Sequence, residues 1–315
     1  MIVRLIVLLK RHAYAFTLEE KPQRLGIFET IDNSNALASL SLTACTPILA
    51  LPGRTAGQIQ IIHLVSQKES SNPISILVAH SSPIACLELS RSGQFLASAS
   101  EKGTLIRVWH VPTSKLVNEL RRGTDRAAIH SIAFSNDETR LVVSSDKGTI
   151  HIFNLVASED MPHAAHEDYG VSRSFGRASS SLSLNSTGNR QSILSSFSSY
   201  LPKYFSSEWS FASFSLPVES KCIVSFTRSD IAIRYKNDAL LGPAFANDES
   251  GILALCADGS VYKFRFDPKK GGDCVMESFH VFWRKSGPNS LGGIQEEDGS
   301  MPDDFWDDWE EDPIL

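Results

Sequence analysis

Residues 95–109 read FLASASEKGTLIRVW, and this stretch decides the fold. A run of apolar and small residues, typical of a buried strand, ends at a Glu-Lys-Gly turn. Beyond the glycine, apolar residues alternate with other residues, which predicts a second, half-buried strand. Residues 141–153, LVVSSDKGTIHIF, repeat the same order of strand, turn and strand. The sequence therefore predicts two β-hairpins of one design.

Similar glycine turns recur along the chain at a nearly constant distance. Gly57, Gly103 and Gly148 lie 46 and 45 residues apart, and a fourth unit starts at Gly259. A period of about 45 residues is typical of the four-stranded blade of a WD-type propeller. We therefore expect an all-β protein with a WD40-like β-propeller fold.

The composition fits a globular protein with a substantial core. Of the 315 residues, 42% are hydrophobic and 21% are charged. The five cysteines are scattered without a Cys-x-x-Cys pair, so we expect reduced thiols and neither a disulfide scaffold nor a metal site. The apolar start, residues 1–9, is closed by Lys10 and Arg11. It is too short for a membrane span and favours a buried strand.

Charge is distributed unevenly along the chain. The formal net charge is −6, but residues 296–312 carry ten acidic side chains and no basic one. The rest of the chain holds 30 basic against 26 acidic side chains, so it is mildly basic. We interpret residues 286–315 as an acidic, disordered tail, because acidic segments that contain proline seldom fold alone.

Between Gly148 and Gly259 the spacing of the glycine turns jumps to 111 residues, mainly because of residues 155–207. This Ser-rich stretch is predicted to be a long loop inserted in one blade. Near its end, apolar residues recur on one face of an expected helix, which Pro202 would end or kink. A core helix that covers the propeller is the alternative, but we favour membrane contact. The expected membrane set is Ile193, Leu194, Phe197, Leu201, Tyr204 and Phe205.

Between the two hairpins lies the motif Leu120-Arg121-Arg122-Gly123. With its flanking repeats, residues 80–153, this motif resembles the PROPPIN family of autophagy-related, phosphoinositide-binding β-propellers. The resemblance covers residues 1–285 and implies a propeller that has seven blades in the family. Residues 1–16 resemble the third blade, so we expect about five blades here and the first two to be absent.

The resemblance implies two lipid head-group pockets, one on each side of the arginine pair, for phosphatidylinositol 3-phosphate and the 3,5-bisphosphate. The first pocket set is His80, Ser100, Thr104, Arg107 and Arg121. The second pocket set is Arg122, Ser145, Lys147, Thr149 and His151. By itself, an arginine pair in a loop is more often a solvated surface feature, and the hydroxyls have an alternative role as turn caps. The repeated Lys-Gly-Thr context on both sides favours binding.

These residue types suit the recognition of phosphate. Arginine presents a planar fork of donors, and each phosphate group carries about −1.5 to −2 charges. Consecutive side chains of an extended segment point to opposite sides, so one arginine pair can serve two pockets. Serine and threonine hydroxyls add hydrogen bonds. His80 and His151 are expected to become charged as the pH falls toward about 6.5.

We therefore expect a non-enzymatic effector without a cofactor that binds phosphoinositide-containing membranes in autophagy. The resemblance implies a cytoplasmic protein, peripheral on preautophagosomal, endosomal or vacuolar/lysosomal membranes, with autophagy partners such as a large lipid-transfer protein. The alternative is a WD-repeat protein-interaction scaffold without lipid specificity. The sequence contains no nucleophile elbow, P-loop, zinc-ligand spacing or paired-carboxylate motif that would indicate an enzyme. It also has no basic-aromatic pattern that would indicate nucleic-acid binding.

Overall fold

The computed structural model describes residues 4–41, 46–65, 72–155, 189, 207–217, 219–227 and 250–282. Every regular element in these ranges is a β-strand, in agreement with the predicted all-β class. Within the same ranges no helix is long and apolar enough to cross a membrane. The acidic tail and its predicted boundary at residues 285/286 lie outside the described residues.

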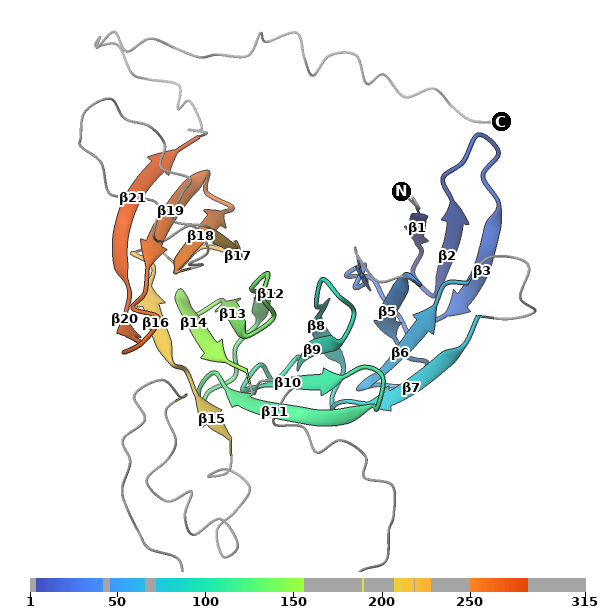
Figure 1. Ribbon diagram of the computed structural model, residues 1–315, viewed down its shortest axis with the longest axis horizontal. Coiled ribbons are helices and arrows are strands. Elements are labelled where there is room, and N and C mark those ends of the chain that lie inside the picture. The colour runs from blue at the N-terminus through green and yellow to red at the C-terminus, as the bar shows by residue number, and fades with distance from the viewer. Residues whose placement is uncertain are drawn as a thin grey trace, which may run out of the picture. The chain divides into compact units, whose positions relative to one another are not determined.

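The strands form five sheets that follow one another in chain order, from blue to orange in Figure 1. The first sheet holds β1 (Arg4–Leu8), β2 (His12–Thr17) and β3 (Arg24–Glu29). The second holds β4 (Ser39–Leu40), β5 (Ile48–Pro52), β6 (Gln58–His63) and β7 (Ile74–Val78). The third holds β8 (Ile84–Leu89), β9 (Phe95–Ser100), β10 (Leu105–His110), β11 (Lys115–Arg121) and β15 (Glu208–Trp209).

The last two sheets come from the C-terminal half of the described chain. The fourth holds β12 (Ile129–Phe134), β13 (Arg140–Ser145), β14 (Thr149–Asn154), β16 (Ala212–Ser215) and β20 (Gly272–Asp273). The fifth holds β17 (Cys222–Thr227), β18 (Gly251–Cys256), β19 (Ser260–Arg265) and β21 (Val275–Val281). Within each sheet, strands that are consecutive in the chain pair antiparallel, as in the blades of a propeller.

The inner sheets are packed on both faces, because alternate residues of a strand point to opposite sides. In β5, Leu49 and Leu51 join a core shared with the first sheet, whereas Ile48 and Ala50 join a core shared with the third. Two further cores join the third sheet to the fourth and the fourth to the fifth. Burial of each large apolar side chain contributes about 1.5–3 kcal/mol, so these four cores hold the sheets together.

The predicted glycine turns are confirmed. Gly57, Gly103, Gly148 and Gly259 precede β6, β10, β14 and β19, with φ angles of 77°, 61°, 63° and 85°. Glycine adopts such angles without the penalty that a Cβ atom brings. At Gly103 a Cβ atom would also lie 1.7 Å from the Ala127 carbonyl oxygen. Glycine at position 103 is thus required both by the turn and by the close approach of the Ala127 backbone.

The strand predicted for residues 1–9 is present as β1, but only one of its faces is covered. Ile6 and Leu8 pack against the core of the first two sheets. Leu5, Val7 and Leu9 are 44%, 38% and 52% exposed. The expectation of a buried strand is therefore wrong for the outward face, because no described element packs on it.

The cysteines of the described ranges are free thiols, namely Cys86, Cys222, Cys256 and Cys274. Burial raises the pKa of each thiol above its ordinary value. Because the thiolate is the reactive form, these side chains are poor nucleophiles at neutral pH.

A short segment that follows the inserted stretch connects the third and fourth sheets. β15 pairs in parallel with the end of β11, and β16 pairs antiparallel with β14. Between the two strands, the Phe211 N–H donates to the Ile152 carbonyl oxygen at 2.8 Å. In Figure 1, β15 and β16 run beside the ends of β11 and β14. Residues 207–216 are thus shared by two neighbouring sheets.

Candidate functional site

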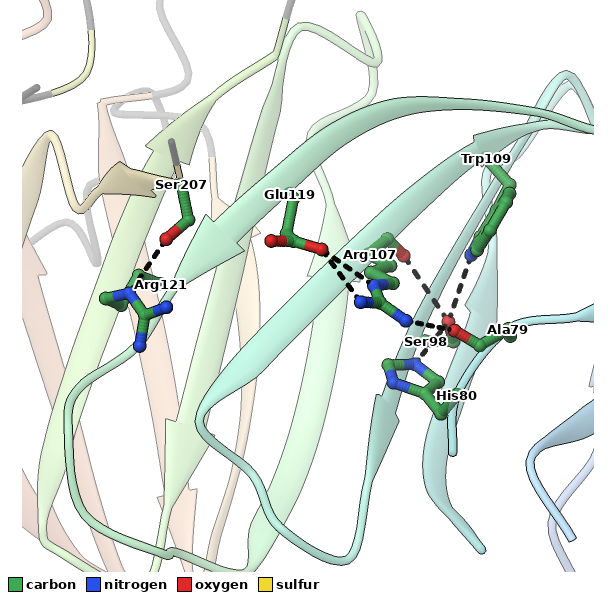
Figure 2. Close-up of polar contacts among 8 residues, drawn as sticks. All are labelled: Ala79, His80, Ser98, Arg107, Trp109, Glu119, Arg121 and Ser207. Carbon is green, nitrogen blue, oxygen red and sulfur yellow. Dashed lines mark hydrogen bonds and ion pairs between the residues drawn. The ribbon is translucent and has the colours of Figure 1, made fainter. Parts of the chain in front are cut away.

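The arginine pair lies where β11 ends, and its two side chains have different partners. Arg121 Nε donates to the Ser207 hydroxyl at 2.7 Å (Figure 2), and Arg122 Nε donates to the Gly103 carbonyl oxygen at 3.2 Å. The Arg122 backbone N–H donates to the Thr104 carbonyl at 3.0 Å, which extends the pairing of β10 with β11. Arg121 and Arg122 are only 6% and 8% exposed. The pair is therefore buried and held in place, unlike a solvated surface feature.

Backbone carbonyl groups accept hydrogen bonds from Arg122 and so stabilise its positive charge. Besides its bond to Gly103, its guanidinium donates to the Asp125 carbonyl. Burial lowers the pKa of Arg122, and the carboxylates of Asp146 and Asp125 raise it in part. Arginine stays protonated under these conditions, because its ordinary pKa lies far above neutral pH. The ion pairs of the described chain do not include Arg122, so it is a fixed, buried cation suited to an anionic ligand.

Arg107, which belongs to the first pocket set, is already paired with a carboxylate. Its Nε and Nη2 atoms both lie 2.9 Å from Glu119 Oε2, and Nη1 donates to the Ala79 carbonyl at 2.7 Å (Figure 2). Arg107 and Glu119 are opposite each other in the β10–β11 register. Glu119 and Arg121 stand two residues apart on β11, so they point to the same face. Glu119 therefore lies between the two cations of the first pocket set and neutralises one of them.

His80 is part of a buried polar network at the contact between the second and third sheets. Its Nε2 atom lies 3.0 Å from the Ser98 hydroxyl, to which Trp109 Nε1 also donates at 3.3 Å (Figure 2). The sequence analysis missed Ser98, Trp109 and Glu119. The available signal was their place within the repeat, on strands whose alternate residues face the neighbouring sheet.

Ser100 and Thr104 lie at the two ends of the Gly103 turn. The Ser100 carbonyl accepts the Gly103 N–H at 2.8 Å, and the Thr104 carbonyl accepts the Arg122 N–H at 3.0 Å. The backbone thus places these two hydroxyl residues next to Arg122 as well as Arg121. The first pocket set is therefore divided between the turn, the arginine pair and the His80 network.

The second pocket set is more compact. Ser145, Lys147 and Thr149 surround the Gly148 turn, where Lys147 N–H donates to the Ser145 hydroxyl at 3.4 Å and Thr149 Oγ1 donates to the Lys147 carbonyl at 3.4 Å. Thr149 and His151 are two residues apart on β14 and point to the same face. The positive charge of Arg122 is close enough to lower the pKa of His151. The charge of Arg122 thus acts on His151 across the contact between the third and fourth sheets.

His151 also has an unused polar atom. Its Nδ1 atom is buried and has no hydrogen-bond partner among the described residues. A buried polar atom without a partner costs roughly 1–3 kcal/mol, so a ligand that bonds to it would recover that free energy. This unused nitrogen, on a ring that the charge of Arg122 affects, makes the second pocket set the better candidate for a ligand site.

The expectation that His80 and His151 become charged near pH 6.5 is wrong for this structure. Burial, and the positive charge of Arg107 in one case and Arg122 in the other, lower the pKa of both rings to about 4. Both imidazoles are therefore neutral at pH 6.5. They contribute hydrogen-bonding atoms to the site and no charge.

The membrane set, Ile193 to Phe205, lies outside the described residues. Two described positions flank that stretch in the sequence: Asn189 contacts Asn154 and Glu208, and Ser207 contacts Arg121. Among the described residues, His, Cys, Asp and Glu side chains form no group of three that could hold a metal ion.

Comparison with known proteins gives a family match. The family model described as PROPPIN matches residues 2–178. SVP1-like protein 2 of Pichia angusta is 38% identical over 221 residues, which cover 70% of this chain and 55% of the relative. Autophagy-related protein 18e of Arabidopsis thaliana is 32% identical over 92% of this chain and 64% of its own length. WD repeat domain phosphoinositide-interacting protein 2 of Xenopus laevis is 32% identical over 91% of this chain and 59% of its length.

The similarity to these relatives covers only part of them, because the chain spans little more than half of their length. Among solved structures, Hsv2 of Kluyveromyces lactis superposes with a TM-score of 0.59 at 19% identity, covering 88% of this chain and 70% of that structure. At this identity the superposition shows similarity of fold alone, and it agrees with the blade-like sheets described above.

Proposed function

The chain belongs to the PROPPIN family, and from this membership we propose that it binds phosphoinositide head groups on membranes through Arg121 and Arg122. The proposed ligands are phosphatidylinositol 3-phosphate and the 3,5-bisphosphate. The protein acts as a recruited effector of autophagy and catalyses no reaction. One relative carries autophagy in its name and another carries phosphoinositide interaction, which supports both parts of the proposal.

The observation that carries the proposal is the buried cation Arg122, held by backbone carbonyls, together with the unpartnered Nδ1 of His151, a ring on which the charge of Arg122 acts. Backbone carbonyls of Gly103 and Asp125 hold the guanidinium, so its orientation is set before any ligand arrives. Preorganised donors bind an anion more tightly, because little conformational entropy remains to be lost. A phosphate group offers several acceptor oxygens and a charge of about −1.5 to −2 to such a site.

The two pocket sets differ in charge. In the second set, Arg122 and Lys147 supply positive charge, and Lys147 is exposed at the turn. In the first set, Arg107 is neutralised by Glu119, which leaves Arg121 as its main cation. We therefore assign the stronger head-group contact to the second set. In the first set, His80 and Arg107 position the sheet end on which Arg121 stands.

Membrane contact by the membrane set would add to head-group binding. Charge attraction at a surface is screened by salt within about 10 Å at an ionic strength of 0.1 M. Burial of a large apolar side chain contributes about 1.5–3 kcal/mol, so even two or three such residues would matter. The proposed place of action is the cytoplasmic face of preautophagosomal, endosomal or vacuolar/lysosomal membranes. Autophagy proteins, such as a large lipid-transfer protein, are the proposed partners.

The test is flotation of the full chain with phosphatidylcholine vesicles that contain phosphatidylinositol 3-phosphate. Arg121→Thr combined with Arg122→Thr should lower bound protein at least about tenfold, because hydrogen bonds to charged groups contribute about 1.5–3 kcal/mol each. Arg54→Thr combined with Arg265→Thr removes the same charge from exposed positions and should leave flotation intact. Arg122→Lys retains the positive charge, so it provides a second variant to measure if the double variant misfolds. Unchanged flotation of a folded double variant would contradict the proposal.

A protein-binding scaffold is the second candidate. An apolar hollow of about 710 Å³, lined by residues such as Leu37, Ala85, Ile129 and Leu255, favours it. This volume is within the range of sites that take small ligands or anchoring side chains. The scaffold function predicts that cofractionation with partner proteins survives loss of both arginines and that the wild-type chain ignores vesicles.

A further inference from the structure

The first pocket set has an acidic side chain among its cations. Glu119 Oε2 accepts hydrogen bonds from both Nε and Nη2 of Arg107, each with an N–O distance of 2.9 Å. The third nitrogen of this guanidinium, Nη1, donates to the Ala79 carbonyl at 2.7 Å. Every nitrogen of the Arg107 side chain therefore has an acceptor within the protein. The Arg107 and Glu119 side chains are 29% and 22% exposed, so a ligand can still reach the pair.

The strand register places this ion pair next to Arg121. In the antiparallel pairing of β10 with β11, Arg107 is opposite Glu119 and Leu105 is opposite Arg121. Residues directly opposite each other share a face of the sheet, and so do residues two apart on one strand. The Cα atoms of a diagonal pair such as Arg107 and Arg121 lie about 7–8 Å apart. Figure 2 shows Glu119 between these two arginines. Two cations thus share one face, with a carboxylate between them.

This carboxylate opposes the binding of an anion at Arg107. It occupies two of the donors that a phosphate group would use. A phosphate placed there would also lie next to a like charge, which is strongly unfavourable where solvent is partly excluded. Arg121 differs, because its Nε donates to the neutral hydroxyl of Ser207. The two arginines of the first pocket set are therefore unequal as phosphate ligands, and Glu119 makes them so.

We propose that Glu119 is a specificity-determining residue, which restricts the first pocket set to a head group with a single monoester phosphate on the inositol ring. The inference rests on the proposed function and refines its choice of ligand. Phosphatidylinositol 3-phosphate carries one such phosphate, and the 3,5-bisphosphate carries two. When Arg121 contacts the first, the second needs a further cation on the same face. Arg107 is that cation, and Glu119 holds it.

Replacement of Glu119 with glutamine tests this assignment. Glutamine keeps the length of the side chain and one acceptor oxygen, and it removes the negative charge. Arg107 then retains its bond to Ala79 and gains the ability to contact a second phosphate. Hydrogen bonds to charged groups change an affinity by about tenfold or more, so affinity for the 3,5-bisphosphate head group should rise about tenfold. Affinity for the 3-phosphate head group should rise less than about threefold, because only screened, longer-range attraction increases.

The experiment is isothermal titration calorimetry with the deacylated lipids, glycerophosphoinositol 3-phosphate and glycerophosphoinositol 3,5-bisphosphate. These probes keep the diester at position 1 and have no acyl chains, so membrane contact does not contribute. Glu277→Gln is the matched control, since Glu277 also contacts two cations, Lys263 and Arg265, and its loss changes the net charge equally. The control is expected to leave both affinities unchanged. A gain of affinity cannot come from loss of fold, so it separates a role in specificity from a purely structural one.

A second variant isolates the mechanism. In the double variant Glu119→Gln with Arg107→Gln the gain should disappear, because the released cation is absent. Measurements repeated in a chain that carries Arg122→Thr assign the gain to the first pocket set.

Three results would overturn the inference: no gain for the 3,5-bisphosphate in Glu119→Gln, an equal gain for both head groups, or a gain that persists without Arg107. In each of these cases a wild-type chain that binds the probes leaves the proposed function standing. If neither the wild-type chain nor Glu119→Gln binds either probe, the proposed function fails and the inference fails with it.

Discussion

Gly103 and Gly148 occupy equivalent turns of the repeat. Replacing each with alanine therefore tests how much the packing between sheets depends on the repeated glycine. Both glycines sit in a Lys-Gly-Thr turn, with φ angles of 61° and 63°. A Cβ atom at Gly103 would lie 1.7 Å from the Ala127 carbonyl oxygen. At Gly148 the nearest atom would be Glu219 Cγ, at 3.5 Å, which is ordinary contact. The two positions thus share a backbone conformation and differ in their surroundings.

The expected magnitudes follow from this difference. For Gly148→Ala the only expected loss of stability comes from the left-handed backbone conformation, which costs an L-residue about 1–2 kcal/mol. Gly103→Ala must also displace the backbone of Ala127, whose N–H donates to the Lys102 carbonyl at 3.2 Å. Overpacking of this kind typically costs a further ~1–3 kcal/mol. Gly103→Ala should therefore lower the free energy of unfolding by more than Gly148→Ala does.

Urea unfolding followed by tryptophan fluorescence, with equal m-values required for both variants, measures the two free energies. The comparison between variants cancels most of the contribution from the unfolded chain, which is the same type of change in each. Equal losses, or a larger loss for Gly148→Ala, would refute the reasoning that the neighbouring sheet restricts the Gly103 turn.

Two further predictions concern pH and charge. The pKa of His80 and His151 is about 4 in the folded chain against 6.5 unfolded, so the unfolded state binds more protons between these values. The free energy of unfolding should be highest above pH 6.5 and fall toward pH 4, by roughly 2–3 kcal/mol for each ring. In urea titrations, the double variant His80→Gln with His151→Gln should show a flatter dependence of this free energy on pH. An unchanged pH dependence would count against the prediction. The double variant Ser195→Asp with Ser198→Asp should weaken flotation with vesicles, because the added charges repel the bilayer and are costly to desolvate. The control, Ser179→Asp with Ser180→Asp, should float as the wild-type chain does. Equal flotation of the two double variants would remove the membrane set from the proposal.

The hairpins could be predicted from the sequence because their signals are local. The glycine turns before β10 and β14 are marked by neighbouring residues, and the alternation along β10 follows from the pleat. The arginine pair at the end of β11 was identified by the resemblance to the PROPPIN family, because a local pattern alone favours a solvated surface feature.

Long-range pairing could not be predicted in this way. β15 and β20 are two residues long, and their hydrogen bonds come from β11 and β16, which are distant in the sequence. The ion pair of Arg107 with Glu119 and the neutral state of His80 depend on burial between sheets. Burial is a property of the assembled sheets, so the family resemblance, which assigns His80 and Arg107 to the first pocket set, could not predict these contacts.

Residues 207–216 connect the third sheet mechanically to the fourth. Tension applied at residue 207 acts lengthwise on β15, which is aligned with β11, and on β16, which is aligned with β14. Strands loaded along their length share the load among several hydrogen bonds, whereas strands peeled from one end yield bond by bond. A pull on Ser207 would therefore load two sheets at once, and Arg121, which donates to that residue, would keep its place at the end of β11.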